Sequence, residues 1–190
     1  SSISTDQIDA ALNDLFKENY KIDNRTLLEL NTSNELFGSQ NFALNEVAVT
    51  KKDTSSMIKV DAYVDDEFLN SYWADGLIVS TPTGSTGYSL SCGGPIIMPQ
   101  SGNIIITPIA QHNLNVRPIV IHDKSIINLK VVDRDDLALI SLDSRSRAFD
   151  SSTEITIKKA SFKIKLINPS FNSFLSTVRN KLMWGIDKRN

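Results

Sequence analysis

Residues 57–73 read MIKVDAYVDDEFLNSYW, and this stretch decides the fold class. Apolar residues stand at every second position from Ile58 to Val64, which predicts a strand with one face in a core and one face in water. Asp65-Asp66 is typical of a tight hairpin turn, and Glu67–Trp73 supplies the returning strand. The stretch therefore predicts an antiparallel β-hairpin.

Short runs of the same kind, separated by turn residues, occupy most of the chain on both sides of this hairpin. They predict strands at Lys21–Asn31, Leu44–Thr50, Leu77–Ser80, Ile104–Thr107, Arg117–His122, Ser125–Val132, Leu137–Leu142, Glu154–Lys159 and Ser161–Ile167. Turns are expected at Asp123-Lys124, Asp133–Asp136 and Ser144–Ser152. Many closely spaced strands favour an antiparallel sandwich or barrel over βαβ units, so the fold class is mainly β.

A helix is predicted near each end of this β region. Ser4 with Gln7 resembles a capping box, and apolar residues at helical spacing follow, so residues 5–18 are expected to be helical. Helical spacing between Phe174 and Leu182 predicts a second helix over residues 170–183. The chain begins Ser1-Ser2 without Met, so we expect it to be a piece of a longer protein, on which both helices could pack.

Composition excludes several classes of partner. The 190 residues carry a net charge of −2, which gives no basic surface for nucleic acid. No run approaches the ~18 apolar residues of a membrane span. The single cysteine, Cys92, cannot form an internal disulfide and fits a reducing compartment, so we expect a cytoplasmic protein.

The glycine-rich stretch Asp75–Pro95 is the first candidate site. Hydroxyl residues and the glycines Gly84 and Gly87 follow a buried strand, and a short helical pattern begins near Gly87. Glycine allows close approach of a ligand, and amides at a helix start favour an anionic or nucleotide-like group. The alternative is a plain loop at a sheet corner. No Lys follows the glycines, so the stretch is not a Walker loop.

Further polar residues are weaker candidates. Asn45-Glu46 could pair with a base edge and with ribose hydroxyls, or could be a polar pair facing water. Asp75 could point toward residues 83–88, or could cap a turn. Neither His112 nor His122 has a Cys or His partner at metal-binding spacing. His112 could line a site, whereas His122 ends a strand and is expected to be structural. Both arginines of the Ser144–Ser152 turn, Arg145 and Arg147, could meet phosphates or be solvated.

Several motifs in order resemble those of the NAD kinase family over nearly the whole chain. Thr81–Thr86 with Gly93-Gly94-Pro95 is similar to a signature of that family, and Asn45-Glu46 is similar to its Asn-Glu motif. Further matches are Thr107-Pro108-Ile109 with His112 and Arg117-Pro118, and Lys181–Gly185. Ser144 departs from the pattern, because the family usually has glycine after the residue that matches Asp143.

The resemblance implies transfer of the γ-phosphate of ATP, or of polyphosphate, to the adenosine 2′-hydroxyl of NAD, which makes NADP. It implies a two-domain enzyme with an N-terminal α/β domain and a C-terminal β-sandwich. The expected domains are residues 1–19, packing on the α/β domain, 20–168, the NAD-binding sandwich, and 169–190, a helix that returns to the α/β domain. Lipid kinases related to diacylglycerol kinase, or a non-catalytic nucleotide-binding module, are the alternatives.

By the resemblance, Asn45 recognises adenine and Glu46 the ribose hydroxyls, while Asp75 reaches the nicotinamide end. The full set of implied NAD-binding residues is Asn45, Glu46, Asp75, Thr83, Thr86, Gly87, Tyr88, Ser91 and Ala110. The family's Gly-Gly-Asp-Gly motif, which carries the presumed general base, is absent from this sequence. The resemblance thus implies no catalytic residue in this chain, Mg²⁺ bound with ATP in the intact enzyme, and a homodimer or homotetramer with Ala110 near a subunit interface.

Overall fold

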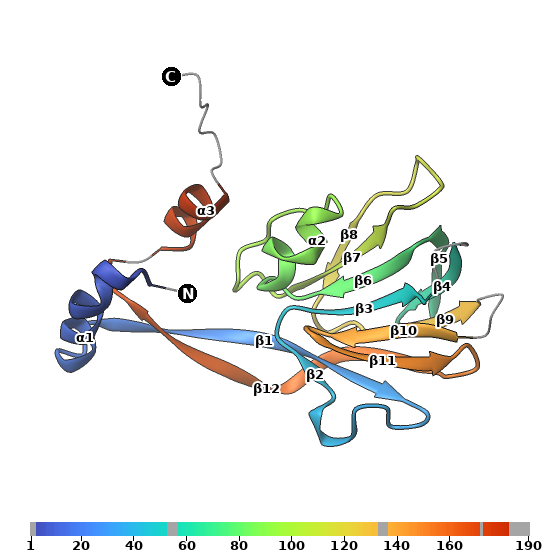
Figure 1. Ribbon diagram of the computed structural model, residues 1–190, viewed down its shortest axis with the longest axis horizontal. Coiled ribbons are helices and arrows are strands. Elements are labelled where there is room, and N and C mark those ends of the chain that lie inside the picture. The colour runs from blue at the N-terminus through green and yellow to red at the C-terminus, as the bar shows by residue number, and fades with distance from the viewer. Residues whose placement is uncertain (1–2, 53–56, 133–136, 172, 183–190) are drawn as a thin grey trace. The chain divides into compact units, whose positions relative to one another are not determined.

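Two six-stranded antiparallel sheets form the protein in a computed structural model that describes residues 3–52, 57–132, 137–171 and 173–182 (Figure 1). The first sheet has the order β2 (Phe42–Ala43), β1 (Tyr20–Thr32), β12 (Ile155–Pro169), β9 (Ile127–Val132), β4 (Ile58–Val64) and β5 (Glu67–Ala74). The second has the order β11 (Arg145–Asp150), β10 (Leu137–Leu142), β3 (Glu46–Lys51), β6 (Gly76–Ser80), β7 (Asn103–Ile109) and β8 (Ile119–His122).

The hairpin predicted from residues 57–73 is present as β4 and β5. Asp65 and Asp66 form its turn with φ values of 51° and 66°, a backbone conformation that aspartate tolerates better than most residues. The Asp65 carboxylate also accepts a hydrogen bond from the Ile126 amide at 2.8 Å. This bond ties the hairpin turn to the start of β9.

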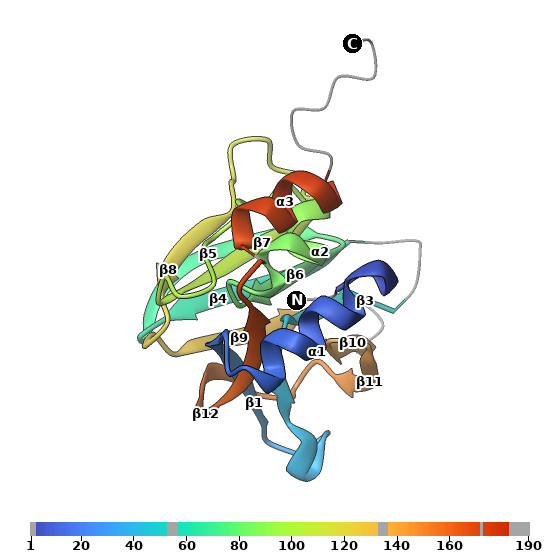
Figure 2. The ribbon, with the colours of Figure 1, turned by 90° about the vertical axis from the view of Figure 1, so that its left-hand side faces the viewer.

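Inward-facing side chains from both sheets form one apolar core, which confirms the predicted sandwich. Residues from the first sheet include Val60 and Leu129, and those from the second include Val79 and Ile140. Strand β6 is buried along its whole length because its second face is covered as well. The short helix α2 (Tyr88–Ser91) lies against it, as Figures 1 and 2 show.

In β11, β12 and β2 the strands differ from the sequence-based prediction. Residues 145–150, predicted as part of a turn, form edge strand β11, because pairing with β10 outweighs a sequence in which only Phe149 is apolar and buried. The two strands predicted between Glu154 and Ile167 are one strand, β12, which continues through the buried Ala160. Strand β2 was not predicted, and the expected Asp133–Asp136 turn lies outside the described residues.

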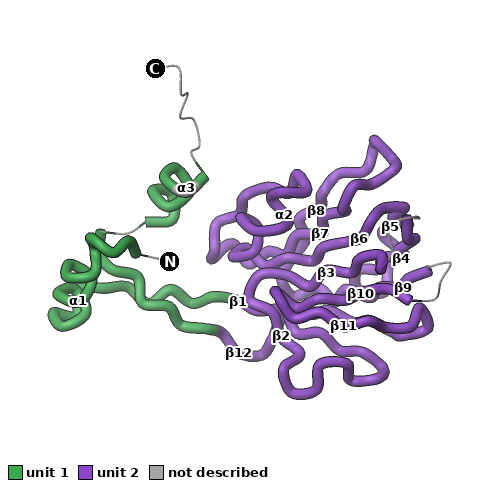
Figure 3. Tube along the Cα trace, viewed as in Figure 1, with its two compact units in different colours: residues 1–25, 164–190 green, residues 26–163 purple. Residues whose placement is uncertain are grey.

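The chain forms two compact units, residues 26–163 and residues 1–25 with 164–190 (Figure 3). The smaller unit holds a 3₁₀ turn, η1 (Thr5–Gln7), and the helices α1 (Ile8–Phe16) and α3 (Phe174–Leu182). Within it, the Asp14 carboxylate accepts bonds from the Ser170 amide and hydroxyl at 2.9 and 2.8 Å. The α-helix predicted over residues 5–18 is shorter in the structure, where a 3₁₀ turn precedes it and it ends at Phe16. The domain limits at residues 19 and 168 stay a prediction.

None of the helices in the described part of the chain has the length and apolar character needed to cross a membrane.

Candidate functional site

The candidate site lies on the outer face of the second sheet, where β3 begins and β6 ends. Val47 and Val49 point into the sandwich core, so the alternation of a strand places Glu46 on the opposite face. Glu46 is directly opposite Ser80 in the β3–β6 register, and directly opposite residues share a face. The Glu46 carboxyl and the Ser80 hydroxyl are therefore neighbours.

The segment that follows β6 folds back over this end of the strands. Thr81 donates from its hydroxyl to the Leu44 carbonyl at 2.7 Å and from its amide to the Asn45 carbonyl at 2.9 Å. Gly84 packs directly on the Asn45 backbone, since a Cβ at position 84 would lie 2.2 Å from the Asn45 oxygen. The glycine predicted for close approach to a ligand thus approaches the chain's own backbone.

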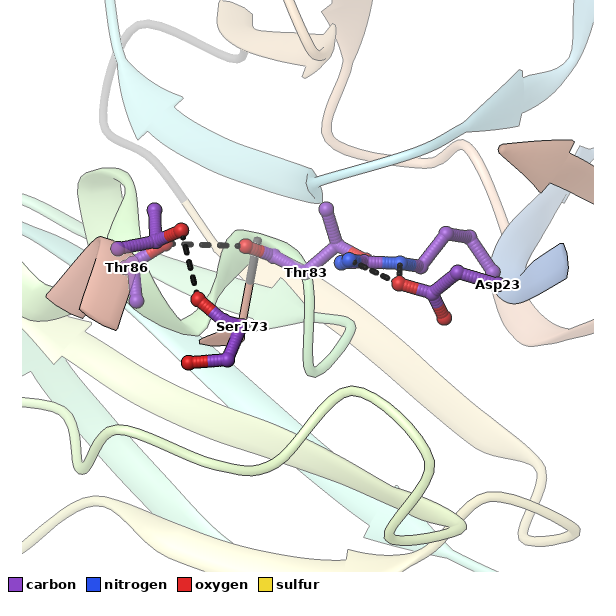
Figure 4. A network of polar contacts seen from close by, with 6 residues as sticks. Asp23, Thr83, Thr86 and Ser173 are labelled. Atoms are coloured by element: carbon purple, nitrogen blue, oxygen red, sulfur yellow. Dashed lines mark hydrogen bonds and ion pairs between the residues drawn. The ribbon is translucent and has the colours of Figure 1, made fainter. Parts of the chain in front are cut away.

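Hydroxyl groups hold the rest of the glycine-rich segment together. Thr86 donates to the Thr83 carbonyl at 3.3 Å within η3 (Gly84–Thr86) (Figure 4). The Ser85 hydroxyl donates to the Pro82 carbonyl at 2.7 Å and accepts from the Ile97 amide at 3.1 Å. Most of these hydroxyls therefore bond to the chain itself, in part as the plain-loop alternative expects.

One residue that the sequence did not reveal, Asp143, organises the opposite side of the site. Its carboxylate accepts hydrogen bonds from the amides of Leu44 at 2.9 Å, Asn45 at 2.7 Å and Glu46 at 3.2 Å. Its own amide donates to the Glu46 carbonyl at 3.0 Å. Asp143 has a φ of 52° at the β10–β11 turn, which aspartate tolerates. The departure at Ser144, beside it, was the one signal in the sequence.

The carboxyl of Glu46, at the centre of this arrangement, has an unsatisfied hydrogen-bond acceptor. Its Oε2 is buried and accepts no hydrogen bond from any described residue, and the Ser80 hydroxyl is also without one there. Burial, together with the negative charge of Asp143, raises the pKa of Glu46 to about 7. A buried carboxyl without donors is costly, so a ligand that brings hydroxyl donors would satisfy it.

Asp75 precedes the other end of β6, five residues from Ser80. It lies at the corner between β5 and β6, where its carboxylate pairs with Lys51 Nζ at 2.6 Å. Five residues of β6 separate this corner from Thr81, which is about 17 Å of strand. Tyr88 connects the two ends: burial raises the pKa of its hydroxyl, and so do the charges of Cys92, Asp75 and Glu46.

The structure distributes the remaining candidates more widely. Gly87 is near Glu46, because a Cβ there would lie 3.5 Å from Glu46 Oε2. Ser91 is exposed at the end of α2, and Ala110 is exposed after β7 with a φ of 45°. His112 donates its amide to the Trp73 carbonyl.

The two arginines contact backbone rather than the candidate site. Arg145 donates to the carbonyls of Gln40, at 2.6 Å, and Phe42, and Arg147 donates to the Ser146 carbonyl at 2.9 Å. Within the part of the chain that the structure describes, no three His, Cys, Asp or Glu side chains gather as metal ligands would.

Fold and geometry together define a two-sheet β-sandwich domain with unsatisfied polar atoms of Glu46 and Ser80 where β3 begins and β6 ends. Residues 44–169 match the model of the ATP-NAD kinase C-terminal domain. The chain is 52% identical to the NAD kinase of Flavobacterium johnsoniae over 100% of its length, and 51% identical to that of Cytophaga hutchinsonii over 97%. The chain belongs to the NAD kinase family, and it spans 63–65% of the length of these relatives.

Solved structures agree with this assignment. An NAD kinase from Archaeoglobus fulgidus in complex with ATP is 28% identical, with a TM-score of 0.78 over 93% of this chain and 67% of that one. Yeast NADH kinase complexed with NADH has a TM-score of 0.87 over 98% of this chain and 57% of that one. At 23% identity the yeast structure supports the fold alone.

Proposed function

We propose that the protein containing this chain is an NAD kinase, and that the chain supplies the surface that binds NAD. The observation that carries the proposal is the buried, unsatisfied Oε2 of Glu46 beside Gly87. A pair of ribose hydroxyls offers the donors that this carboxyl lacks. Family membership favours this activity over the lipid-kinase and non-catalytic alternatives.

The polar residues at the two ends of β6 are proposed to meet the two halves of a dinucleotide. Asn45 and Glu46, with Thr83, Thr86 and Gly87, are proposed to bind the adenosine half. Asp75, held by Lys51, is proposed to bind the nicotinamide half, and Tyr88 to pack between them. Ser91 and Ala110 complete the proposed set. A separation of about 17 Å along β6 favours an elongated ligand over a single small group.

In the proposed reaction the adenosine 2′-oxygen attacks the γ-phosphorus of ATP, and the bond from that phosphorus to the β–γ bridging oxygen breaks. The 2′-hydroxyl proton passes to a general base, and the products are NADP and ADP. Phosphoryl transfer depends mostly on positioning and charge stabilisation. Glu46 orients the ribose in this proposal, while the base is assigned to the N-terminal α/β domain and not to this chain.

Mg²⁺ is proposed to enter with ATP in the intact enzyme, since Mg²⁺ in such sites is held mainly by substrate phosphates, waters and one or two carboxylates. No metal ligand is proposed in this chain. ATP as the donor is supported by the ATP complex of the Archaeoglobus relative. The free Cys92 favours the cytoplasm as the location, and we expect a homodimer or homotetramer.

The test measures NADP formation by the full-length protein and its Glu46→Ala variant. Loss of a charged acceptor for two hydroxyls is expected to lower kcat/KM for NAD by about 10- to 100-fold. Glu67→Ala, an exposed carboxylate in the β4–β5 hairpin, is the matched control and should match wild type. Wild-type kcat/KM in the Glu46→Ala variant would contradict the role of Glu46, and absence of NADP would contradict the function.

A further inference from the structure

The backbone of Leu44, Asn45 and Glu46 is held on both of its polar sides. All three amides donate to one carboxylate, that of Asp143. The carbonyls of Leu44 and Asn45 accept from Thr81, and that of Glu46 accepts from the Asp143 amide. Every amide and every carbonyl of this backbone segment has a partner within the chain, so the segment is fixed before any ligand binds.

We propose that Asp143 is a positioning residue for ligand binding, which acts on Asn45 and Glu46 through their backbone amides. This inference rests on the proposed function, because it assigns Asn45 and Glu46 to NAD. Hydrogen bonds to a charged acceptor are stronger than those to a neutral one, and three converge here from consecutive residues. In this proposal Asp143 acts through those amides, and no direct contact with the ligand is assigned to it.

The same carboxylate acts on Glu46 by its charge. Its amide bonds place it next to Glu46, and a like charge at short range disfavours the ionised form of the Glu46 carboxyl. Among the described residues, Tyr88 of α2 also lies within the influence of Glu46: burial raises the pKa of its hydroxyl, and so do the charges of Cys92, Asp75 and Glu46. Asp143 therefore holds the Glu46 backbone in place while it makes the Glu46 side chain harder to ionise, a state that hydroxyl donors from a ligand would relieve.

Two substitutions both remove the charge and differ in how many acceptor bonds they leave. Asp143→Asn keeps the shape and tolerates a positive φ, but it removes the charge and turns an NH₂ group toward backbone amides. Asp143→Gly keeps the backbone conformation and removes all three acceptor bonds. The matched control is Asp65→Asn, since Asp65 also has a positive φ and also accepts a backbone amide bond across the sheet, in a turn remote from Glu46.

Amide hydrogen exchange and NAD titration on the full-length protein test the proposal. In Asp143→Asn and Asp143→Gly we expect exchange at residues 44–46 to quicken by about tenfold or more, with the Kd for NAD raised to a similar degree. The pH midpoint of NAD binding should move to lower pH in Asp143→Asn, because removal of a like charge favours the Glu46 carboxylate. Asp65→Asn should leave the exchange, the Kd and the midpoint unchanged.

Wild-type Kd and an unmoved midpoint in both Asp143 variants would overturn the positioning role. So would a loss of affinity in Asp65→Asn equal to that in Asp143→Asn, because the effect would then be one of general stability. If the wild-type protein does not bind NAD at all, the proposed function fails instead. The exchange rates at residues 44–46 still report on the backbone role in that case.

Discussion

A single carboxyl group, Glu46, concentrates the energetics of the site. It is the first residue of β3 and lies beside the glycine-rich segment, and its buried Oε2 accepts no hydrogen bond from a described donor. In an isolated domain this is a cost, and in a ligand complex it is a source of affinity and selectivity. The residue that weakens the unliganded protein is thus the one proposed to recognise the ribose.

This cost predicts a pH-dependent effect of Glu46→Gln on stability. The pKa of Glu46 rises from 4.5 to about 7 on folding, so the folded state binds the Glu46 proton more tightly than the unfolded state does. The free energy of unfolding therefore falls as the pH rises from 4.5 to about 7. Glutamine has no such titration. After allowance for partial exposure, the variant should be more stable than wild type by about 2 kcal/mol at pH 8, with a smaller difference at pH 5. Urea unfolding at both pH values measures this.

The control for this prediction is Glu67→Gln, which alters an exposed carboxylate of the hairpin and should change stability equally at the two pH values. A difference between wild type and Glu46→Gln that is the same at pH 5 and pH 8 would mean that Glu46 ionises normally in the folded protein.

At the scale of the elements, one arginine connects the edges of the two sheets. Arg145, on β11 of the second sheet, donates to the Phe42 carbonyl on β2 of the first and to the Gln40 carbonyl beside it. Its guanidinium also lies 5.6 Å from the Phe42 ring centroid. Arg145, which the sequence offered as a phosphate-binding candidate, therefore joins the edge strands of the two sheets on one side of the sandwich.

Replacement by lysine should weaken this connection. A lysine ammonium lacks the planar fork that reaches two carbonyls, so Arg145→Lys is expected to lower the free energy of unfolding by about 1–2 kcal/mol. Arg147→Lys is the matched control, because Arg147 donates only to the neighbouring Ser146 carbonyl among the bonds described and lies 5.8 Å from the Phe37 ring centroid. If thermal or urea unfolding showed equal losses of unfolding free energy in Arg145→Lys and Arg147→Lys, the connection between the two sheets would add nothing to stability.

The element scale also shows what the sequence could predict. The β4–β5 hairpin followed from alternation and from two consecutive aspartates, because its partners are adjacent in the chain. Strand β11 did not, since its polar residues carry no strand pattern and its pairing with β10 supplies the order. In the site, Asn45, Glu46 and the glycine-rich segment stood out by residue type. Asp143 did not, because its contacts depend on the β3–β10 register.

Across the whole molecule, the two longest strands pass from one compact unit into the other. Strand β1 begins in the smaller unit and enters the larger one at Thr26, and β12 leaves it after Lys163. Their burial changes along their length: Leu27, Leu28 and Leu30 are in the core region, whereas Lys21 and Ile22 are exposed. The same strand therefore has a stable part and a weakly supported part.

Hydrogen exchange along β1 should reveal this gradient. Amides at residues 27–30 are expected to exchange only when the sandwich opens, and amides at residues 20–25 to exchange by local opening, about 100-fold faster or more. The corresponding halves of β12, residues 155–160 and 161–168, should differ in the same direction. Uniform protection along β1 in exchange measurements by NMR would indicate that both units unfold as one.

The reach of Asp143 has a consequence for the order in which the protein assembles. The three amides from which its carboxylate accepts hydrogen bonds lie 97–99 residues earlier in the chain, so their contact closes a long loop. Contacts of such high sequence separation form late, after the loop-closure entropy has been overcome. The ligand site is thus one of the last parts to form, and a bound ligand should act on the rate of unfolding more than on the rate of folding.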